Sequence, residues 1–146
     1  MSTLERAIAI AAEAHAGQTD KAGAPYILHP LRIMLAVSST EERIVAVLHD
    51  VCEDCPGWTF DRLRAEGFPP RILEALDSVT KREGEAYEDF VRRAGRDPIG
   101  RAVKRADLRD NMDLSRIAAP GPRDHARLER YRAALATLPP ATLPPD

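Results

Sequence analysis

The stretch that most constrains the fold is residues 44–54, with the sequence IVAVLHDVCED. Its apolar first half predicts a buried helix, and the four ionisable residues His49, Asp50, Glu53 and Asp54 follow without a break. On a helix, residues three or four positions apart share neighbouring rows, so these side chains would crowd together. Like charges at that spacing repel, and burying an unpaired carboxylate is costly. The cluster therefore needs a positive partner, and a divalent metal ion is the candidate.

The composition favours an all-α fold. Aromatic residues make up only 5% of the 146 residues, while alanine, leucine, arginine and glutamate are abundant, a bias towards helix rather than sheet. A chain of this length is long enough for one core and too short for two domains of ordinary size. We therefore expect one helical domain over residues 1–138, followed by a proline-rich tail over residues 139–146.

The charge balance gives no reason to expect a nucleic-acid or membrane partner. The net charge of −2 comes from 21 basic and 23 acidic residues. The first residues are charged, unlike a secretory signal, and no apolar run approaches the roughly 20 residues of a membrane-spanning helix. We expect a cytoplasmic protein, monomeric or homodimeric, whose partner is a small molecule.

Apolar spacing, capping residues and proline or glycine breaks predict a series of helices separated by short loops. Residues 17–26 contain two glycines and a proline and predict an irregular loop. Because proline suits the first turn of a helix, Pro30 predicts that His29 lies immediately before the second helix, at a rigid corner. The predicted helices are 3–16, 31–37, 39–56, 59–67, 69–79, 85–94, 97–117 and 124–138.

Four side chains from three of these segments are candidate metal ligands: His29, His49, Asp50 and Asp107. Two imidazoles and two carboxylates form a mixed nitrogen and oxygen set that suits Mn(II), Fe(II) or Zn(II), and we expect manganese. Taken singly, each residue also has a structural explanation. His29 could cap a helix, His49 could be a hydrogen-bonded core histidine, and Asp107 could pair with the basic residues beside it.

Three motifs occur in a fixed order: GxPYxxHP at residues 23–30, LHDxxED at residues 48–54 and KxADxxxNM at residues 104–112. Together they resemble the HD-domain metal-dependent phosphohydrolases, in particular the hydrolase domain of the RelA/SpoT alarmone enzymes and their small stand-alone relatives. A single His-Asp pair is a weak signal, whereas three ordered motifs are specific. The resemblance implies an HD-domain helical bundle that holds its metal through the four candidate ligands. It also implies catalytic roles for Glu53 and Asp54.

The reaction implied by this resemblance is removal of the 3′-pyrophosphate of guanosine tetra- or pentaphosphate (ppGpp) by a metal-activated water, a step of the stringent response. A metal ion lowers the pKa of a bound water and neutralises charge on phosphoryl oxygens. Glu53 and Asp54 would orient or deprotonate that water, or else support the metal ligands as hydrogen-bond acceptors. Most of the basic residues near the motifs are expected to be ordinary solvated surface; this set comprises Lys21, Lys81, Arg82, Lys104, Arg105 and Arg109, of which Lys21 and Lys81 are the best candidates for phosphate binding. The candidate substrate-binding residues are Lys21, Tyr26, Lys81 and Asn111.

The loop before the first motif departs from the family pattern. Small alarmone hydrolases usually carry an Arg-Lys pair there, whereas this chain has Thr19, Asp20 and Lys21. Two alternatives to ppGpp hydrolysis therefore stay open. The same site could act on another nucleotide or phosphoester, such as a nucleoside monophosphate or NADPH, or the protein could be a non-catalytic nucleotide sensor. The presence of both Glu53 and Asp54 favours an enzyme, because a binding protein needs no spare acids.

Overall fold

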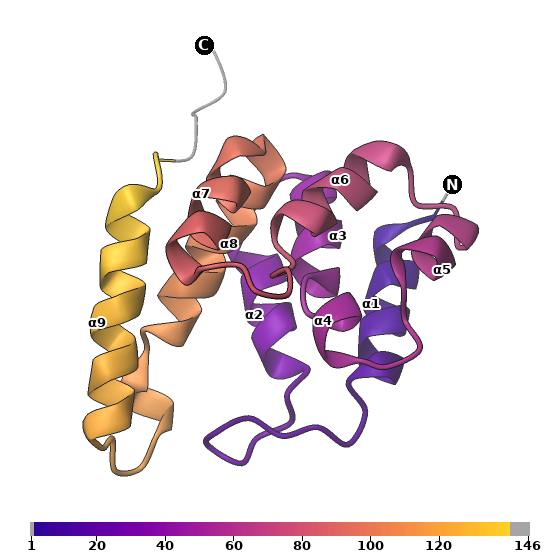
Figure 1. Ribbon diagram of the computed structural model, residues 1–146. Helices are drawn as coiled ribbons and strands as arrows, with labels where there is room; N and C mark the ends of the chain where they lie inside the picture. Colours follow the sequence, from indigo (N-terminus) through magenta and orange to yellow (C-terminus); the bar gives the residue numbers. More distant parts are fainter. Residues whose placement is uncertain (1, 141–146) are drawn as a thin grey trace.

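The computed structural model describes residues 2–140 and is built from helices joined by short loops, with no β-strand among the described residues (Figure 1). The all-α prediction is thus confirmed, and the arrangement is compatible with an HD-domain bundle. None of the described helices is both long and apolar enough to cross a membrane. Of the predicted tail, residues 141–146 lie outside the described part. The helices are α1 (Leu4–Ala14), α2 (Leu28–Ala36), α3 (Thr40–Leu48), α4 (Val51–Asp54), α5 (Phe60–Ala65), α6 (Pro70–Ser78), α7 (Tyr87–Arg96), α8 (Pro98–Asn111), the 3-10 helix η1 (Leu114–Arg116) and α9 (Pro122–Thr137).

Helix α3 lies at the centre of the core and contacts α1, α2, α6 and α8. It starts with the predicted capping box, in which the Glu42 N–H donates to Ser39 Oγ over 3.1 Å and the Ser39 N–H donates to the Glu42 carboxylate over 2.8 Å. Every residue from Ile44 to Leu48 is buried. A helix end that is apolar on all sides is stable only inside the protein. This helix therefore delivers the residues that follow it into the interior.

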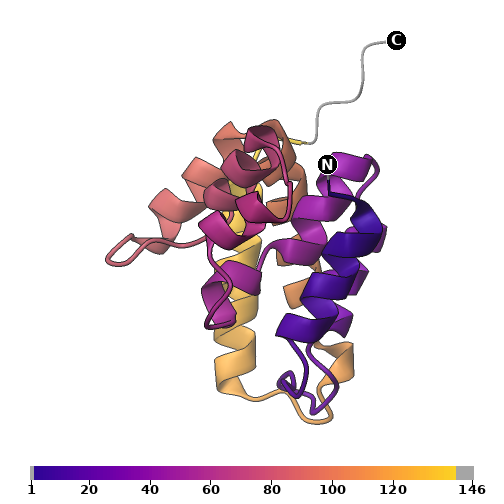
Figure 2. The same ribbon diagram turned by 90° about the vertical axis from the view of Figure 1, so that its right-hand side faces the viewer.

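The last helix adds a second, smaller apolar cluster on the other side of the molecule. There α9 packs against α8 and α7 through Val91, Leu108, Ala134 and Leu138. In Figure 1, α9 and α1 lie at opposite sides, with α8 and α2 between them. Both views place the loop after α1 and the segment leading into α9 at the same end of the molecule (Figures 1 and 2). Residues of both segments line the cavity described below.

The start of α2 differs from the prediction. The helix begins at Leu28 rather than at residue 31, so His29 lies inside its first turn and Pro30 follows it there. The first N–H groups of a helix have no intrahelical acceptor, so a proline in the first turn loses no hydrogen bond at any of these positions. The prediction that His29 precedes the helix was therefore wrong by a few residues, although its side chain is still fixed by the helix start.

The predicted continuous helix over residues 39–56 was also wrong, because α3 ends at Leu48 and the short helix α4 begins at Val51. The His49 ring explains the break. Its Nδ1 lies 2.6 Å from the Ala46 carbonyl oxygen, which also accepts the His49 backbone N–H over 3.4 Å. In a continuous helix that carbonyl would accept the N–H of Asp50. A side chain that inserts into the helix ladder bends the chain, here at the two predicted metal ligands.

Helix α8 ends earlier than predicted, at Asn111 rather than near residue 117. Asp113 then accepts the backbone N–H of Ser115 over 2.9 Å and starts the 3-10 helix η1. An aspartate that bonds nearby backbone N–H groups competes with the α-helical ladder and favours such a turn. The turn brings Arg116 back to α8, where its Nη2 donates to the Asp110 carbonyl oxygen over 2.8 Å.

Gly100 marks a close approach between α8 and α6. A Cβ at this position would lie 2.1 Å from Ser78 Oγ and 3.1 Å from the Ala94 carbonyl oxygen. We expect Gly100→Ala to lower the free energy of unfolding by about 2 kcal/mol in chemical denaturation, since overpacking outweighs the better helix propensity of alanine. Adding Ser78→Ala should recover part of this loss. A Gly100→Ala protein as stable as the wild type would contradict the close packing.

Candidate metal centre and substrate cavity

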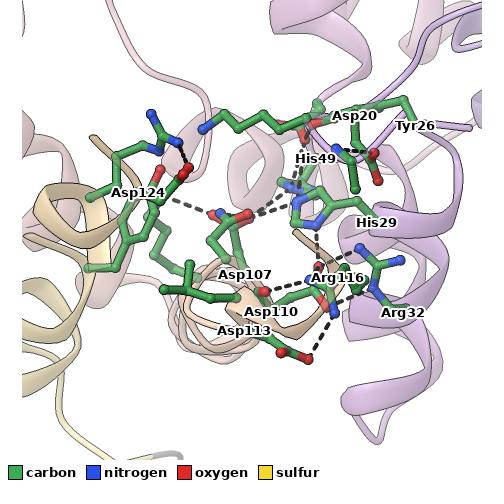
Figure 3. Close-up of a pocket in the computed structure, with 18 of the residues that line it drawn as sticks. Asp20, Tyr26, His29, Arg32, His49, Asp107, Asp110, Asp113, Arg116 and Asp124 are labelled. Carbon is green, nitrogen blue, oxygen red and sulfur yellow. Dashed lines mark hydrogen bonds and ion pairs between the residues drawn. The ribbon is translucent and has the colours of Figure 1, made fainter. Parts of the chain in front are cut away.

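Three segments bring the four predicted metal ligands together, and Figure 3 shows three of them, His29, His49 and Asp107, turned toward one another. His29 comes from the first turn of α2, His49 and Asp50 from the bend between α3 and α4, and Asp107 from α8. Asp107 Oδ1 lies 3.0 Å from His29 Nε2 and 3.5 Å from His49 Nε2. Asp50 Oδ2 lies 3.1 Å from His49 Nε2 and 3.9 Å from His29 Nε2. The convergence predicted from the sequence is therefore present in the structure.

The donor atoms suit a divalent cation. His29, His49 and Asp50 each offer a ligand atom within 4.8 Å of the other two. His49 Nδ1 donates to the Ala46 carbonyl, which leaves the Nε2 lone pair free, and this Nε2 is buried without a hydrogen-bond partner among residues 2–140. A buried polar atom without a partner is costly unless an ion or a water satisfies it. Two imidazoles and two carboxylates are a set that borderline divalent metals prefer.

Asp107 is held from both sides by residues of its own helix. Lys104 Nζ lies 3.1 Å from Asp107 Oδ2, and Asn111 Nδ2 donates to Oδ1 over 3.1 Å. Lys104 is an exception to the expectation that most basic residues near the motifs are solvated surface, because it is only 7% exposed and its Nζ lies 4.5 Å from the centre of the Phe90 ring. The reason is that Lys104 and Asp107 share a helix face at the i,i+3 spacing, and this face points inward.

The carboxylates and imidazoles shift each other's pKa values. Burial raises the pKa of Asp107, but the positive charge of Lys104, the hydrogen bond with His29 and the nearby His49 ring outweigh burial and hold it well below its ordinary value. Burial lowers the pKa of His29, but hydrogen bonds to Asp107 and Asp110 outweigh this effect and raise it. The carboxylates are therefore ionised, and they favour positive charge on the two rings. A divalent cation could supply this charge in place of protons.

The two candidate catalytic acids lie on α4, one turn beyond the bend. Both are exposed to solvent, but only Glu53 borders the cavity described below, and Asp54 does not. Partial burial and the negative charges of Asp50 and Asp54 raise the pKa of Glu53. Partial burial and Asp50 likewise raise the pKa of Asp54. A carboxylate with a raised pKa is better matched to proton transfer near neutral pH. Glu53 therefore combines a place at the cavity border with a raised pKa.

A cavity of about 510 Å³ opens beside the four ligands and is bordered by all four predicted substrate-binding residues. Tyr26 donates its hydroxyl to the Asp50 carboxylate, which ties it to the metal centre. Lys21 is exposed on the loop after α1, and Lys81 is exposed on the loop before α7. Asn111 projects from α8 on the same face as Asp107. The cavity thus combines the acidic metal centre with lysines from two separate loops.

The sequence reasoning assigned no role to Asp110, although Asp110 contacts a predicted metal ligand. Its Oδ2 accepts His29 Nδ1–H over 2.6 Å, and its carboxylate also binds Arg32 of α2 (Figure 3). Burial raises the pKa of Asp110, but the hydrogen bonds from His29 and Arg32 outweigh it and hold the pKa far below its usual range. The sequence signal that could have indicated a role for Asp110 was its position one helical turn after Asp107, on the same face of the helix. Its partners became visible only once α2 was seen to pack against α8.

Asp20 was also missed, and it shapes the loop that carries Lys21. Its Oδ1 accepts the backbone N–H groups of Ala22 and Ala24, each over 2.9 Å. An aspartate that accepts the N–H two residues further on forms a turn. An aspartate within the predicted loop was the sequence signal that could have indicated this turn. The turn holds Lys21 at the cavity border. Burial and the positive charge of Arg127 lower the pKa of this lysine.

Sequence comparison gives the site a context. No family model matches the chain. A protein of Mycobacterium leprae named probable GTP pyrophosphokinase is 33% identical over 133 residues, which cover 82% of this chain and 17% of that protein. A guanosine-3′,5′-bis(diphosphate) 3′-pyrophosphohydrolase of Aquifex aeolicus is 31% identical over 121 residues, 75% of this chain and 17% of the relative. The bifunctional (p)ppGpp synthase/hydrolase SpoT of Escherichia coli is 32% identical over 90 residues, 59% of this chain and 12% of its own length.

The chain thus spans less than a fifth of the length of these relatives. The matches agree with the resemblance carried by the three motifs and with the all-helical fold. The chain belongs to the family of the RelA/SpoT alarmone enzymes, of which it matches a domain-sized part.

Proposed function

We propose that the protein is a Mn²⁺-dependent hydrolase that removes the 3′-pyrophosphate of ppGpp and releases pyrophosphate and a guanosine 5′-nucleotide. The observation that carries this proposal is the convergence of His29, His49, Asp50 and Asp107 at one side of the cavity. Relatives named guanosine-3′,5′-bis(diphosphate) 3′-pyrophosphohydrolase support the choice of substrate. The mixed donor set supports a borderline divalent metal, of which Mn²⁺ is our choice.

The proposed roles of the residues follow from their positions. The two imidazoles and two carboxylates would hold the cation, which supplies Lewis acidity to the phosphoryl oxygens and makes water at the site more acidic. Glu53 borders the cavity and would accept the proton of the attacking water, helped by its raised pKa. Asp54 would help to raise the pKa of Glu53 by placing a negative charge beside it. Asp50 is oriented by the Tyr26 hydroxyl.

The substrate carries several negative charges, and the cavity offers cations on more than one side. Lys21 and Lys81 would bind phosphate groups from the two exposed loops. Lys104 also lines the cavity, where it balances the charge of Asp107. Asn111 donates to Asp107 with one amide hydrogen and has a second available for a ribose or phosphate oxygen. These contacts are proposals for the bound state.

The test is to incubate the purified protein with ppGpp and Mn²⁺ and to separate the products by anion-exchange chromatography. We expect pyrophosphate and guanosine 5′-nucleotide in equal amounts, and loss of turnover when EDTA is added and restored by excess Mn²⁺. Parallel reactions with guanosine monophosphate and NADPH test the alternative substrates. Turnover of one of these compounds with ppGpp left intact would contradict the proposal. Binding of ppGpp without hydrolysis of any compound would instead support the alternative of a non-catalytic nucleotide sensor.

A further inference from the structure

We propose that Asp110, clamped by Arg32, is a positioning residue that fixes the His29 ring for metal binding. The inference deepens the proposed function, because it rests on the same metal centre. It concerns residues outside the predicted ligand set and outside the predicted catalytic and substrate-binding residues.

The two nitrogens of His29 face different partners. Its Nε2 points to the metal centre, 3.0 Å from Asp107 Oδ1 and 3.9 Å from Asp50 Oδ2. Its Nδ1 points away from the centre and lies 2.6 Å from Asp110 Oδ2 (Figure 3). Nδ1 and Nε2 are separated by Cε1 and point in divergent directions in the ring plane, so a carboxylate bound at Nδ1 does not share a cation held at Nε2. Its carboxylate acts on the ring itself.

Asp110 is held in place by an arginine from the same helix that carries His29. Arg32 donates from Nε to Oδ1 over 2.8 Å and from Nη2 to Oδ2 over 3.0 Å, the two-pronged geometry that fits a carboxylate. Arg116 adds a bond of 2.8 Å from Nη2 to the Asp110 carbonyl oxygen. The Asp110 side chain is only 12% exposed. Thus His29 and Arg32, one turn apart on α2, meet Asp107 and Asp110, one turn apart on α8.

The contact with Asp110 determines which nitrogen of His29 is available to bind a metal ion. A carboxylate accepts hydrogen bonds and does not donate them, so Nδ1 carries a proton in this contact. When His29 is neutral, Nε2 then holds the lone pair that a metal needs, and the hydrogen bond prevents the ring from turning away. His49 obtains the same tautomer from the Ala46 carbonyl, a backbone group that no substitution removes. Asp110 is therefore the side chain through which the tautomer of one ligand can be tested.

The experiment measures Mn²⁺ affinity in the absence of any nucleotide, at a temperature well below the unfolding transition of each variant. Asp110→Ala should raise the Mn²⁺ dissociation constant about 10- to 100-fold, the usual effect of removing a carboxylate that supports a histidine ligand. Arg32→Gln should weaken binding less. The double variant should bind no more weakly than Asp110→Ala, because Arg32 acts through Asp110.

Asp61→Ala is the matched control, since it removes one exposed negative charge from α5, where Asp61 pairs with Arg64 of the same helix. A purely structural role for Asp110 predicts a lower melting temperature in EDTA and a Mn²⁺ affinity equal to that of Asp61→Ala, and this result would overturn the proposal. The Mn²⁺ affinity is measured without nucleotide and therefore does not depend on ppGpp hydrolysis. A wild-type protein that binds Mn²⁺ and leaves ppGpp intact contradicts the proposed function alone, whereas tight binding by Asp110→Ala contradicts the positioning role alone.

Discussion

Replacing Asp107 with alanine is expected to abolish stoichiometric Mn²⁺ binding and to destabilise the fold. The carboxylate contacts both His29 and His49 at the proposed metal centre, and its second oxygen pairs with Lys104. Alanine removes one proposed ligand and leaves the ammonium group of Lys104 buried without its counter-charge. Breaking a buried ion pair by removing one partner typically costs about 3–5 kcal/mol of folding free energy. Loss of the bound cation adds a further effect of about 2.7 kcal/mol when the free metal is at 100 times its dissociation constant.

Metal content by mass spectrometry and melting temperature with Mn²⁺ or EDTA measure the two effects separately. The wild-type melting temperature should fall when EDTA replaces Mn²⁺, whereas that of Asp107→Ala should be low in both conditions. Asp89→Ala is the control, because Asp89 is exposed and pairs with Arg92 on the surface of α7. An Asp107→Ala protein that keeps the wild-type metal stoichiometry would remove Asp107 from the ligand set.

The sequence was sufficient to predict the side chains that meet at the centre of the molecule. Residues 44–48 are apolar on every side, so their helix had to be buried, and the ionisable residues that follow had to accompany it into the interior. Ser39 and Glu42 at the capping spacing identified the correct start of that helix. The order of the three motifs supplied His29 and Asp107, which spacing alone could not connect. The fold class and the ligand convergence were therefore predictable from local pattern and family resemblance.

The parts that the sequence did not predict depend on individual side-chain contacts, some of them local and some between distant elements. The bend after Leu48 arises because the His49 ring takes the Ala46 carbonyl, and helix propensity contains no information about that hydrogen bond. Lys104 is buried because Phe90 of α7 and Asp107 of its own helix surround its ammonium group, although lysine is usually exposed. The contact between Asp110 and Arg32 joins residues 78 positions apart. The Asp110–Arg32 pair follows from the packing of α2 against α8 and not from either segment alone.

Replacing Glu53 with glutamine is expected to lower kcat by about 10²- to 10⁴-fold while Mn²⁺ binding and the melting temperature stay near their wild-type values. Glutamine keeps the size and most of the hydrogen-bonding capacity of the side chain but cannot accept a proton from water. Glu53 is exposed and has no ion pair among residues 2–140, so its replacement removes little packing. Steady-state kinetics with ppGpp and Mn²⁺ measure this effect.

The pH profile separates a proton acceptor from a residue that only shapes the cavity. A general base must be deprotonated, so wild-type kcat/KM should fall as the pH drops through the pKa of Glu53. Partial burial, Asp50 and Asp54 raise that pKa, which moves the fall to a higher pH than an ordinary glutamate would give. The Glu53→Gln protein should lose this acidic limb, and the control Glu74→Gln, on the exposed face of α6, should retain it. Full activity of Glu53→Gln with an unchanged acidic limb would exclude Glu53 as the base and direct attention to Asp54.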